Sequence, residues 1–254
     1  MFGLLTGKKA LVTGAAQGIG KAVALIYAQN GADVILCDLN EIKVTAAARE
    51  IADATGQQCI GLKMDITSKK DTAVAVAYAV HTFGRLDILC NSAGILLHAK
   101  LMEMSEEAWD KIFAVNMKGA FLITQAAAKV MVEQKHGKIV HVSSCSGKKP
   151  TMEEAGYCST KSALNGFVKV CALELGTYGI NVNAICPGAT DTEMVRKTFI
   201  TSPEVEQEWI DKTALKRLGT VEDQAKVALF LSSTLADHIT GEAIIVSAGE
   251  MMSQ

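Results

Sequence analysis

Short apolar runs alternate with longer, helix-like segments from one end of the chain to the other. In each short run, β-branched and other apolar residues occupy consecutive positions, which is typical of parallel strands that helices cover on both faces. The pattern predicts seven strands, at residues 10–13, 33–37, 59–64, 86–91, 138–143, 181–186 and 243–246. Helical spacing of apolar positions predicts six helices, at residues 18–30, 41–55, 68–83, 105–134, 157–178 and 221–234. Strands joined through helices by right-handed crossovers give an α/β fold with a doubly wound parallel sheet.

The chain is expected to form a single domain over residues 1–254, because no linker, repeat or low-complexity tract divides it. Its one long connection, at residues 191–218, is polar and mixed in composition. Connections of that length are usually lids or binding loops. We therefore expect a substrate lid at about residues 189–218.

The composition excludes several classes of protein. With 25 basic and 27 acidic residues and a net charge of −2, the chain lacks the dense basic patch that nucleic-acid and membrane-surface binders need. The longest apolar run, Ala73 to Val80, is much shorter than a membrane span, and residues 1–7 do not resemble a signal peptide, so a cytoplasmic protein is expected. Seven cysteines without a CxxC pair indicate reduced, mostly buried thiols rather than disulfides or metal ligands.

A glycine-rich segment follows the first predicted strand. Gly14, Gly18 and Gly20 lie at the start of the next helix, with Gln17 and Ile19 among them. Glycines let the backbone turn sharply and approach a pyrophosphate, whose charge is stabilised by the free N–H groups and the dipole of a helix N-terminus. The segment therefore predicts a Rossmann-type dinucleotide-binding site.

Asp38, at the end of the second strand, bears on the choice of nicotinamide cofactor. A carboxylate there accepts hydrogen bonds from the adenosine ribose but repels a 2′-phosphate. Leu39 is also expected to contact the cofactor, but neither Leu39 nor Asn40 supplies the positive charge that such a phosphate needs. NAD is therefore predicted, and NADP is the less favoured alternative. Capping the following helix is a second role open to Asp38, compatible with the first.

Further residues complete the expected cofactor site at the ends of the third and fourth strands. In sheets of this type, ligands bind at the carboxyl ends of the strands. The residues expected there are Asp65, Ile66, Asn91, Ala93 and Gly94.

A tyrosine and a lysine open the fifth predicted helix. Tyr157 and Lys161 are four residues apart and therefore share one helical face. A phenol acts as a base at neutral pH only if its pKa falls by roughly three units, or about 4 kcal/mol. One ammonium about 4 Å away, at an effective dielectric constant of about 20, supplies roughly that. Ser143 and Ser144 end the fifth strand at the same sheet edge, so a hydroxyl is expected beside the pair.

These blocks together resemble the short-chain dehydrogenase/reductase family, in its classical form of about 250 residues. The resemblance covers essentially the whole chain, in the TGxxxGxG loop at residues 13–20, the NNAG-like block at residues 91–94, the helix residue Asn116, the strand-end serine, the YxxxK pair and the segment at residues 187–192. It implies a catalytic set of Asn116, Ser144, Tyr157 and Lys161, and the offset to Tyr157 selects Ser144 over Ser143. It also implies that Tyr157, Lys161, Pro187, Gly188, Thr190 and Thr192 contact the cofactor.

The resemblance implies hydride transfer between an alcohol carbon and the nicotinamide, without a metal. Tyr157 would be the general base in oxidation and the general acid in reduction. Lys161 would lower the pKa of Tyr157 and hold the nicotinamide ribose, while Ser144 would bind the substrate oxygen. Asn116 would order a water that carries the proton away.

The sequence departs from the family pattern in two places. Ser92 stands where the family usually has the second Asn of its NNAG block, which is expected to weaken a structural hydrogen bond without affecting the chemistry. Residues 247–249 read Ser-Ala-Gly, where the family often has Asp-Gly-Gly in a region that packs subunits and borders the substrate.

The substrate is expected to be recognised by residues 95–100, 145–156 and 189–218. One set of side chains there suits an apolar substrate: Leu96, Leu97, Met152, Met194, Val195, Phe199 and Trp209. Another set suits a phosphate or carboxylate: His98, Lys148, Lys149 and Arg196. We favour a secondary alcohol or ketone such as a hydroxysteroid or bile acid, with a sugar alcohol (polyol) or a 3-oxoacyl thioester as alternatives. A nucleotide-sensing protein without turnover is the non-enzymatic alternative, against which the intact Ser144, Tyr157 and Lys161 argue.

The helix at residues 157–178 is apolar on more than one side. A helix of this kind is usually buried on several sides. In a doubly wound domain its outer side meets either solvent or another subunit, and the family commonly pairs this helix across a two-fold axis. We therefore expect a homotetramer, or at least a dimer, that uses this helix and the one at residues 105–134.

Overall fold

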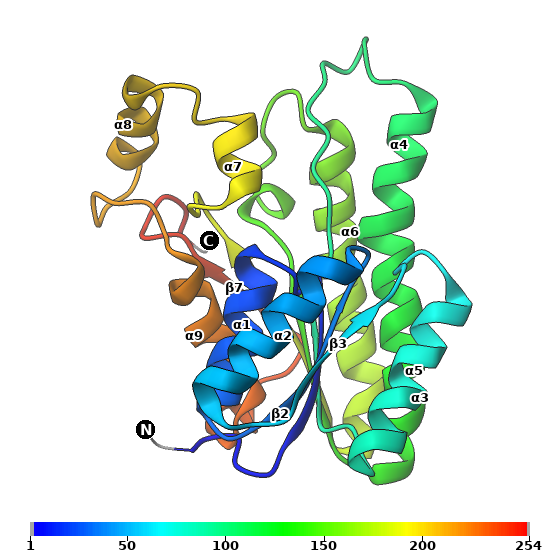
Figure 1. Ribbon diagram of the computed structural model, residues 1–254. Coiled ribbons are helices and arrows are strands. Elements are labelled where there is room, and N and C mark those ends of the chain that lie inside the picture. Colours follow the sequence, from blue (N-terminus) through cyan, green and yellow to red (C-terminus); the bar gives the residue numbers. More distant parts are fainter. Residues whose placement is uncertain (1–2, 253–254) are drawn as a thin grey trace.

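All seven predicted strands lie in one parallel sheet in the computed structural model, which describes residues 3–252 (Figure 1). Their order is β3-β2-β1-β4-β5-β6-β7, and each observed strand begins and ends within about two residues of its prediction. The strands are β1 (Lys9–Thr13), β2 (Asp33–Asp38), β3 (Cys59–Lys63), β4 (Ile88–Asn91), β5 (Gly137–Val142), β6 (Ile180–Pro187) and β7 (Ala243–Val246). The α/β, doubly wound fold class is confirmed.

Helices cover both faces of this sheet (Figure 1). Helices α1, α2 and α9 pack over one apolar cluster, whereas α3, α5 and α6 pack over the other. The bounds are α1 (Gly18–Gln29), α2 (Glu41–Thr55), α3 (Lys69–Phe83), α4 (Glu106–Phe113), α5 (Gly119–Gln134), α6 (Ala155–Leu175), α7 (Glu193–Thr198), α8 (Pro203–Asp211) and α9 (Val221–Ser232). No helix within residues 3–252 is both long and apolar enough to span a membrane.

The structure differs from the predicted helices at two places. The segment predicted as one helix at residues 105–134 is α4 and α5 joined by a π-helical turn, Ala114–Lys118. The expected lid contains two short helices, α7 and α8, which the apolar pattern did not predict. Their N-caps, Thr192 and Ser202, each accept a hydrogen bond from the third helical residue. Helices of six and nine residues are too short to show a clear apolar period.

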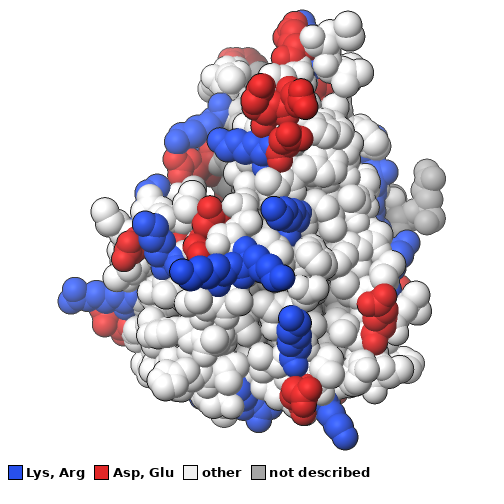
Figure 2. Space-filling model, turned by 90° about the vertical axis from the view of Figure 1, so that its right-hand side faces the viewer, with Lys and Arg blue, Asp and Glu red and all other residues white. Residues whose placement is uncertain are grey.

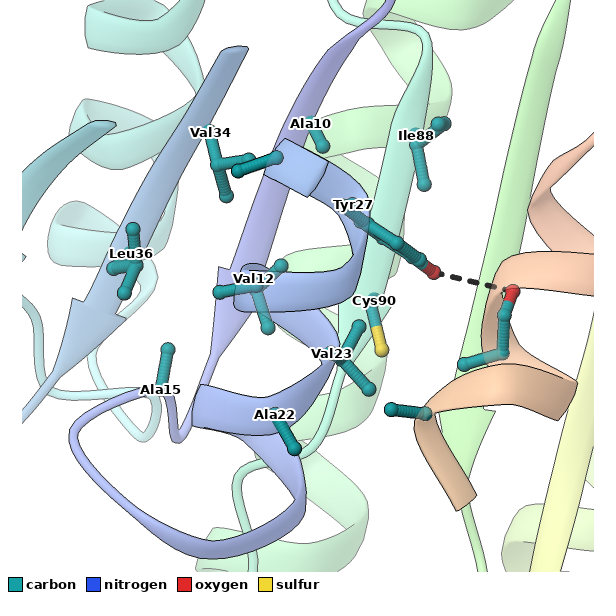
Figure 3. Packing of buried hydrophobic residues seen from close by; sticks show 14 of the residues in the cluster. Ala10, Val12, Ala15, Ala22, Val23, Tyr27, Val34, Leu36, Ile88 and Cys90 are labelled. Carbon is teal, nitrogen blue, oxygen red and sulfur yellow. Dashed lines mark hydrogen bonds between the residues drawn. The ribbon is translucent and has the colours of Figure 1, made fainter. Parts of the chain in front are cut away.

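Close packing of α1 against the sheet and α9 fixes the position of the glycine-rich segment. Figure 3 shows the side chain of Tyr27 reaching from α1 across the buried cluster, and its hydroxyl lies 2.5 Å from Ser232 Oγ on α9. Tyr27 is fully buried, and Val23 packs one turn before it. This packing holds α1 against the sheet, and the N-terminal end of the helix then lies at the edge where the strands end.

The strand register brings the functional segments to that edge. Thr13 of β1 pairs with Cys37 of β2 and with Asn91 of β4, and Asn91 pairs in turn with His141 of β5. In a parallel sheet all carboxyl ends meet at one edge, so segments that follow different strands become neighbours.

Candidate functional site

A cavity of about 860 Å³ lies above the carboxyl ends of the strands. Loops after β1, β2, β4, β5 and β6 contribute to its wall, as do the start of α6 and the segment with α7 and α8. The predicted residues that line it are Gly14, Gln17, Gly18, Ile19, Gly20, Asp38, Gly94, Ser144, Tyr157, Lys161, Pro187, Gly188, Thr190 and Thr192. The cofactor segment and the catalytic candidates therefore share one space.

The glycine-rich segment forms a tight backbone cradle at one end of the cavity. Gly14 has φ +62°, and a Cβ there would lie 2.8 Å from the backbone of Ala93. A Cβ on Gly20 would lie 2.2 Å from the carbonyl oxygen of Gly14. Both positions require glycine, because a larger residue would displace the loop from the strand ends.

The N-terminus of α1 is open to an anion. Its N-cap, Gln17, makes no side-chain capping bond, and its first turn has no acidic residue. By contrast, α2, α3 and α9 begin with the capping residues Asn40, Ser68 and Thr220. Uncapped N–H groups and a positive helix end facing a cavity are suited to a pyrophosphate.

Asp38 lies on the rim of the cavity and is held by backbone donors. Ala16 N donates to its Oδ2 at 3.2 Å, and Asn40 N donates to its Oδ1 at 3.0 Å. The N-cap of α2 is Asn40, whose side chain accepts from Lys43 N. Asp38 therefore does not cap this helix, and its carboxylate stays directed at the rim.

Sequence reasoning missed Lys43, which also lines the cavity. Its Nζ donates to Gln17 Oε1 at 3.1 Å, and it lowers the pKa of Glu193 on α7, after the larger effect of Lys197. Gln17, Lys43 and Glu193 thus bring the glycine loop, α2 and α7 together. Lys43 stands in the first turn of α2, shortly after Asp38, and this placement was the available signal in the sequence.

Ser144, Tyr157 and Lys161 meet at the other end of the cavity. Lys161 is buried, and its Nζ donates to the carbonyl oxygen of Val142 at 2.8 Å. The same Nζ lies 5.5 Å from the centroid of the Tyr157 ring. Ser144 Oγ accepts from Ser146 N at 3.0 Å. The predicted grouping of a phenol, an ammonium and a hydroxyl is present.

The predicted lowering of the Tyr157 pKa was wrong for this arrangement. Burial raises the pKa of Tyr157 well above its usual value, and a hydrogen bond with Ser144 opposes this rise only in part. Burial also lowers the pKa of Lys161 to about 8. The ammonium donates to Val142 rather than to the phenol, so desolvation of the hydroxyl outweighs its attraction to that charge.

Asn116 lies in the π-helical turn between α4 and α5 and is 2% exposed. Its Oδ1 accepts from Ile95 N at 2.8 Å, and its Nδ2 donates to Ile95 O and to Thr160 Oγ1. The helix is therefore distorted at Asn116. Its amide ties the loop after β4 to the helix that carries Tyr157, although Asn116 itself does not line the cavity.

Five predicted cofactor residues do not line the cavity either: Leu39, Asp65, Ile66, Asn91 and Ala93. Leu39 is exposed, and Asp65 accepts hydrogen bonds from Thr67 within its own loop. Ile66 is buried, and Ala93 N donates to Thr13 Oγ1. Their contact with a cofactor stays a prediction.

Asn91 belongs to a buried network beneath the cavity. Its Oδ1 accepts from Thr13 Oγ1 at 2.6 Å, and its Nδ2 lies 3.3 Å from His141 Nδ1. On the far side of the ring, His141 Nε2 lies 3.2 Å from Thr124 Oγ1, which donates to Ala120 O. The imidazole is therefore neutral, with its proton on Nε2, and burial lowers its pKa to about 3. The network joins β1, β4, β5 and α5 under the site.

The cavity fits a nicotinamide dinucleotide. The open end of α1 and the glycine cradle suit the pyrophosphate, and Asp38 suits a ribose diol. Tyr157 and Lys161 at the opposite end suit the nicotinamide, because hydride transfer there is accompanied by transfer of a proton. No group of three or more His, Cys, Asp or Glu side chains placed to hold a metal ion occurs within residues 3–252.

Known proteins agree with this picture over nearly the full length of the chain. Residues 14–250 match a family model described as enoyl-(acyl carrier protein) reductase. A 3-oxoacyl-[acyl-carrier-protein] reductase, FabG, of Aquifex aeolicus is 37% identical over 96% of this chain and 98% of its own. An NAD-dependent glycerol dehydrogenase of Listeria innocua is also 37% identical, over 96% of this chain and 94% of its own.

Solved structures agree as well. The structure of a short-chain type dehydrogenase/reductase from Mycobacterium ulcerans superposes with a TM-score of 0.93 at 32% identity, covering 97% of this chain and 90% of that one. The glycine cradle, the shared cavity and these full-length likenesses lead to the same conclusion: the chain belongs to the short-chain dehydrogenase/reductase family, as an oxidoreductase that acts on a CH–OH group.

Proposed function

We propose that this protein is an NAD-dependent dehydrogenase that interconverts a small polyol and its ketone. The observation that carries the proposal is the single cavity with Asp38 at one end and Ser144, Tyr157 and Lys161 at the other. One relative is named as an NAD-dependent glycerol dehydrogenase, and this supports both the cofactor and the substrate class. The hydroxysteroid that the sequence favoured has less support among the relatives than the alternatives, a polyol or a 3-oxoacyl thioester.

The chain's own residues provide the proton chemistry. A bound nicotinamide supplies the acceptor or donor of the hydride. In oxidation, Tyr157 takes the proton of the alcohol as its C–H hydride leaves, and in reduction the phenol returns that proton to the ketone oxygen. Ser144 hydrogen-bonds the reacting oxygen, and Lys161 contributes positive charge beside the phenol. Asn116 holds the loop at Ile95 against the helix of Tyr157.

The cofactor preference can be reversed if Asp38 excludes the 2′-phosphate. Asp38→Ala combined with Leu39→Arg should raise kcat/KM for NADP relative to NAD by roughly 10- to 100-fold. The variant loses a repulsive carboxylate and gains a charge-assisted hydrogen bond, which is worth about 1.5–3 kcal/mol. Leu39→Arg alone keeps Asp38 and should keep the preference for NAD. Steady-state kinetics with both cofactors measures this, and a native protein that prefers NADP contradicts the proposal.

A 3-oxoacyl thioester reductase is the second candidate, because the cavity also has an apolar wall. Leu96, Met152, Met194, Val195, Phe199 and Trp209 line it, and Phe199 packs on Trp209 with ring centroids 5.6 Å apart. Such a wall suits an acyl chain. Assays of glycerol, vicinal diols, a hydroxysteroid and an acetoacetyl thioester, followed by absorbance of the reduced cofactor, separate the candidates. Turnover confined to the thioester would replace the polyol proposal.

We also propose that the protein is a homotetramer or a dimer. The helices α5 and α6 keep apolar side chains exposed: Phe121 is 41%, Val170 52% and Leu173 81% exposed. Figure 2 shows the side of the molecule that carries α3, α4 and α5, where uncharged residues cover much of the face. Light scattering after size exclusion should give a mass of two or four times 26.9 kDa. A mass near 26.9 kDa at micromolar concentration would contradict the proposal.

A further inference from the structure

A glutamate that no assigned role explains lies at the substrate end of the cavity. Glu154 immediately precedes α6, three residues before Tyr157, and it lines the cavity together with Ser144 and Ser146. It is 3% exposed. Its backbone is fixed at two points, because its carbonyl accepts from Cys158 N at 2.8 Å and its strand-like bridge to Ala99 joins the loop after β4.

The carboxylate of Glu154 has weak partners in the protein. Its Oε2 lies 3.8 Å from Cys158 Sγ, a poor donor. A hydrogen bond with Ser146 and the nearby His98 stabilise its charge only in part. Within residues 3–252, no lysine or arginine forms an ion pair with it. Burial is the main effect on this group and raises the pKa of Glu154. A buried carboxylate with so little compensation is costly unless a ligand supplies donors.

Glu154 also disfavours alcohol oxidation by Tyr157. Its negative charge contributes to the raised pKa of Tyr157, after the larger effect of burial, and so disfavours the phenolate that oxidation needs. Glu154 is the N-cap of α6, but its side chain makes no capping hydrogen bond. The start of the helix therefore does not explain why a carboxylate stands here. A benefit in substrate recognition would account for its position.

We propose that Glu154 determines substrate specificity by accepting a hydrogen bond from a second hydroxyl group of the substrate, close to the reacting carbon. Lys161, whose ammonium lies beside the same tyrosine, disfavours a cationic substrate at this point. An acyl chain against Glu154 would leave the carboxylate without a donor. This inference rests on the proposed polyol dehydrogenase and narrows its substrates to those with vicinal hydroxyl groups.

The test compares Glu154→Leu and Glu154→Gln with the native protein on two alcohols of equal chain length, 2,3-butanediol and 2-butanol. Loss of a hydrogen bond to a charged group should lower kcat/KM for the diol by roughly 10- to 100-fold in the Leu variant. 2-Butanol should change by less than about threefold, because it offers nothing for Glu154 to accept. The Gln variant should fall between the native protein and the Leu variant.

Glu153→Gln is the matched control. It removes the same charge from the neighbouring residue, whose partly exposed carboxylate lies 3.4 Å from His98 Nε2 and does not line the cavity. Both alcohols should be oxidised as by the native protein. Equal losses for the two alcohols in Glu154→Leu, or no loss for the diol, would overturn the inference.

A binding measurement separates this inference from the wider proposal. The dissociation constant of 2,3-butanediol for the NADH-saturated protein can be measured by cofactor fluorescence, whether or not turnover occurs. Weaker diol binding in Glu154→Leu supports the role of Glu154, and unchanged binding refutes it. Failure of the proposed function would appear differently, as a native protein that oxidises no alcohol with NAD.

Discussion

Tyr157→Phe is expected to lower alcohol oxidation by about 10³-fold while NAD still binds. Positioned acid–base groups typically contribute about 10²- to 10⁴-fold to a rate, and the substitution removes the only titrating atom of this side chain. The ring stays, so its packing at the start of α6 should survive. Steady-state turnover and the dissociation constant of NAD, measured on the same preparation, test both parts.

The pH dependence provides a second readout for Tyr157. Because burial raises the pKa of Tyr157, the phenol form predominates at neutral pH and oxidation should accelerate as the pH rises. The residual rate of Tyr157→Phe should lack this rise. Tyr178→Phe, at an exposed tyrosine beyond the same helix, is the control and should behave as the native protein. Activity of Tyr157→Phe within tenfold of the native level would show that another group transfers the proton.

Lys161→Met should abolish most turnover and yet stabilise the fold. Burial lowers the pKa of Lys161 from 10.5 to about 8, so the folded state holds an ammonium that prefers water. This shift corresponds to about 3 kcal/mol at neutral pH. Removing the ammonium should stabilise the folded state by that amount, but loss of the hydrogen bond to Val142 O offsets about 1–2 kcal/mol of it. The free energy of unfolding of the variant should therefore be about 1–2 kcal/mol higher than that of the native protein, and its melting temperature several degrees higher.

The sign of this effect can be checked through its pH dependence. Below pH 8 the lysine is protonated in both the folded and unfolded states, and the penalty on the native protein is complete. As the pH rises from about 8 to 10.5, the folded state loses the proton first, so the penalty shrinks and the advantage of Lys161→Met should disappear. Urea unfolding at pH 7 and pH 9.5 measures this difference. Lys169→Met, at an exposed position on α6, should show no such pH-dependent gain.

The sequence predicted the sheet well because the residues that favour strands locally are also the apolar residues that a buried sheet needs. A buried parallel strand needs apolar residues on both faces, and a run such as 34–37 meets that need. The site's backbone was equally predictable. Gly14 is required by its close contact with Ala93, and Gly20 by its close contact with Gly14. The spacing of these glycines in the sequence shows both requirements.

The parts that sequence reasoning missed depend on side-chain placement in space. Lys43 reaches the cavity from α2, and Glu154 lies in it because the segment before α6 folds back toward the loop after β4. Neither position follows from residue spacing. The pKa of Tyr157 was misjudged for the same reason, since residue spacing reveals the charge of Lys161 but not the burial of the phenol. Short helices α7 and α8 were missed because six and nine residues give little periodic signal.

The central position of β1 has a consequence for how the chain acquires its structure. Its partners are β2 on one side and β4 on the other, and Thr13 bonds to Asn91 across 78 residues of sequence. During synthesis, the first three strands can pair before β4 exists, which leaves one edge of β1 open to other chains. Pairing across such separations is slow, because the entropy of loop closure is lost before the stabilising contacts form. Refolding should therefore pass through a state in which β1, β2 and β3 are paired but the other strands are not. Ligand binding should return only when the remaining strands have joined the sheet.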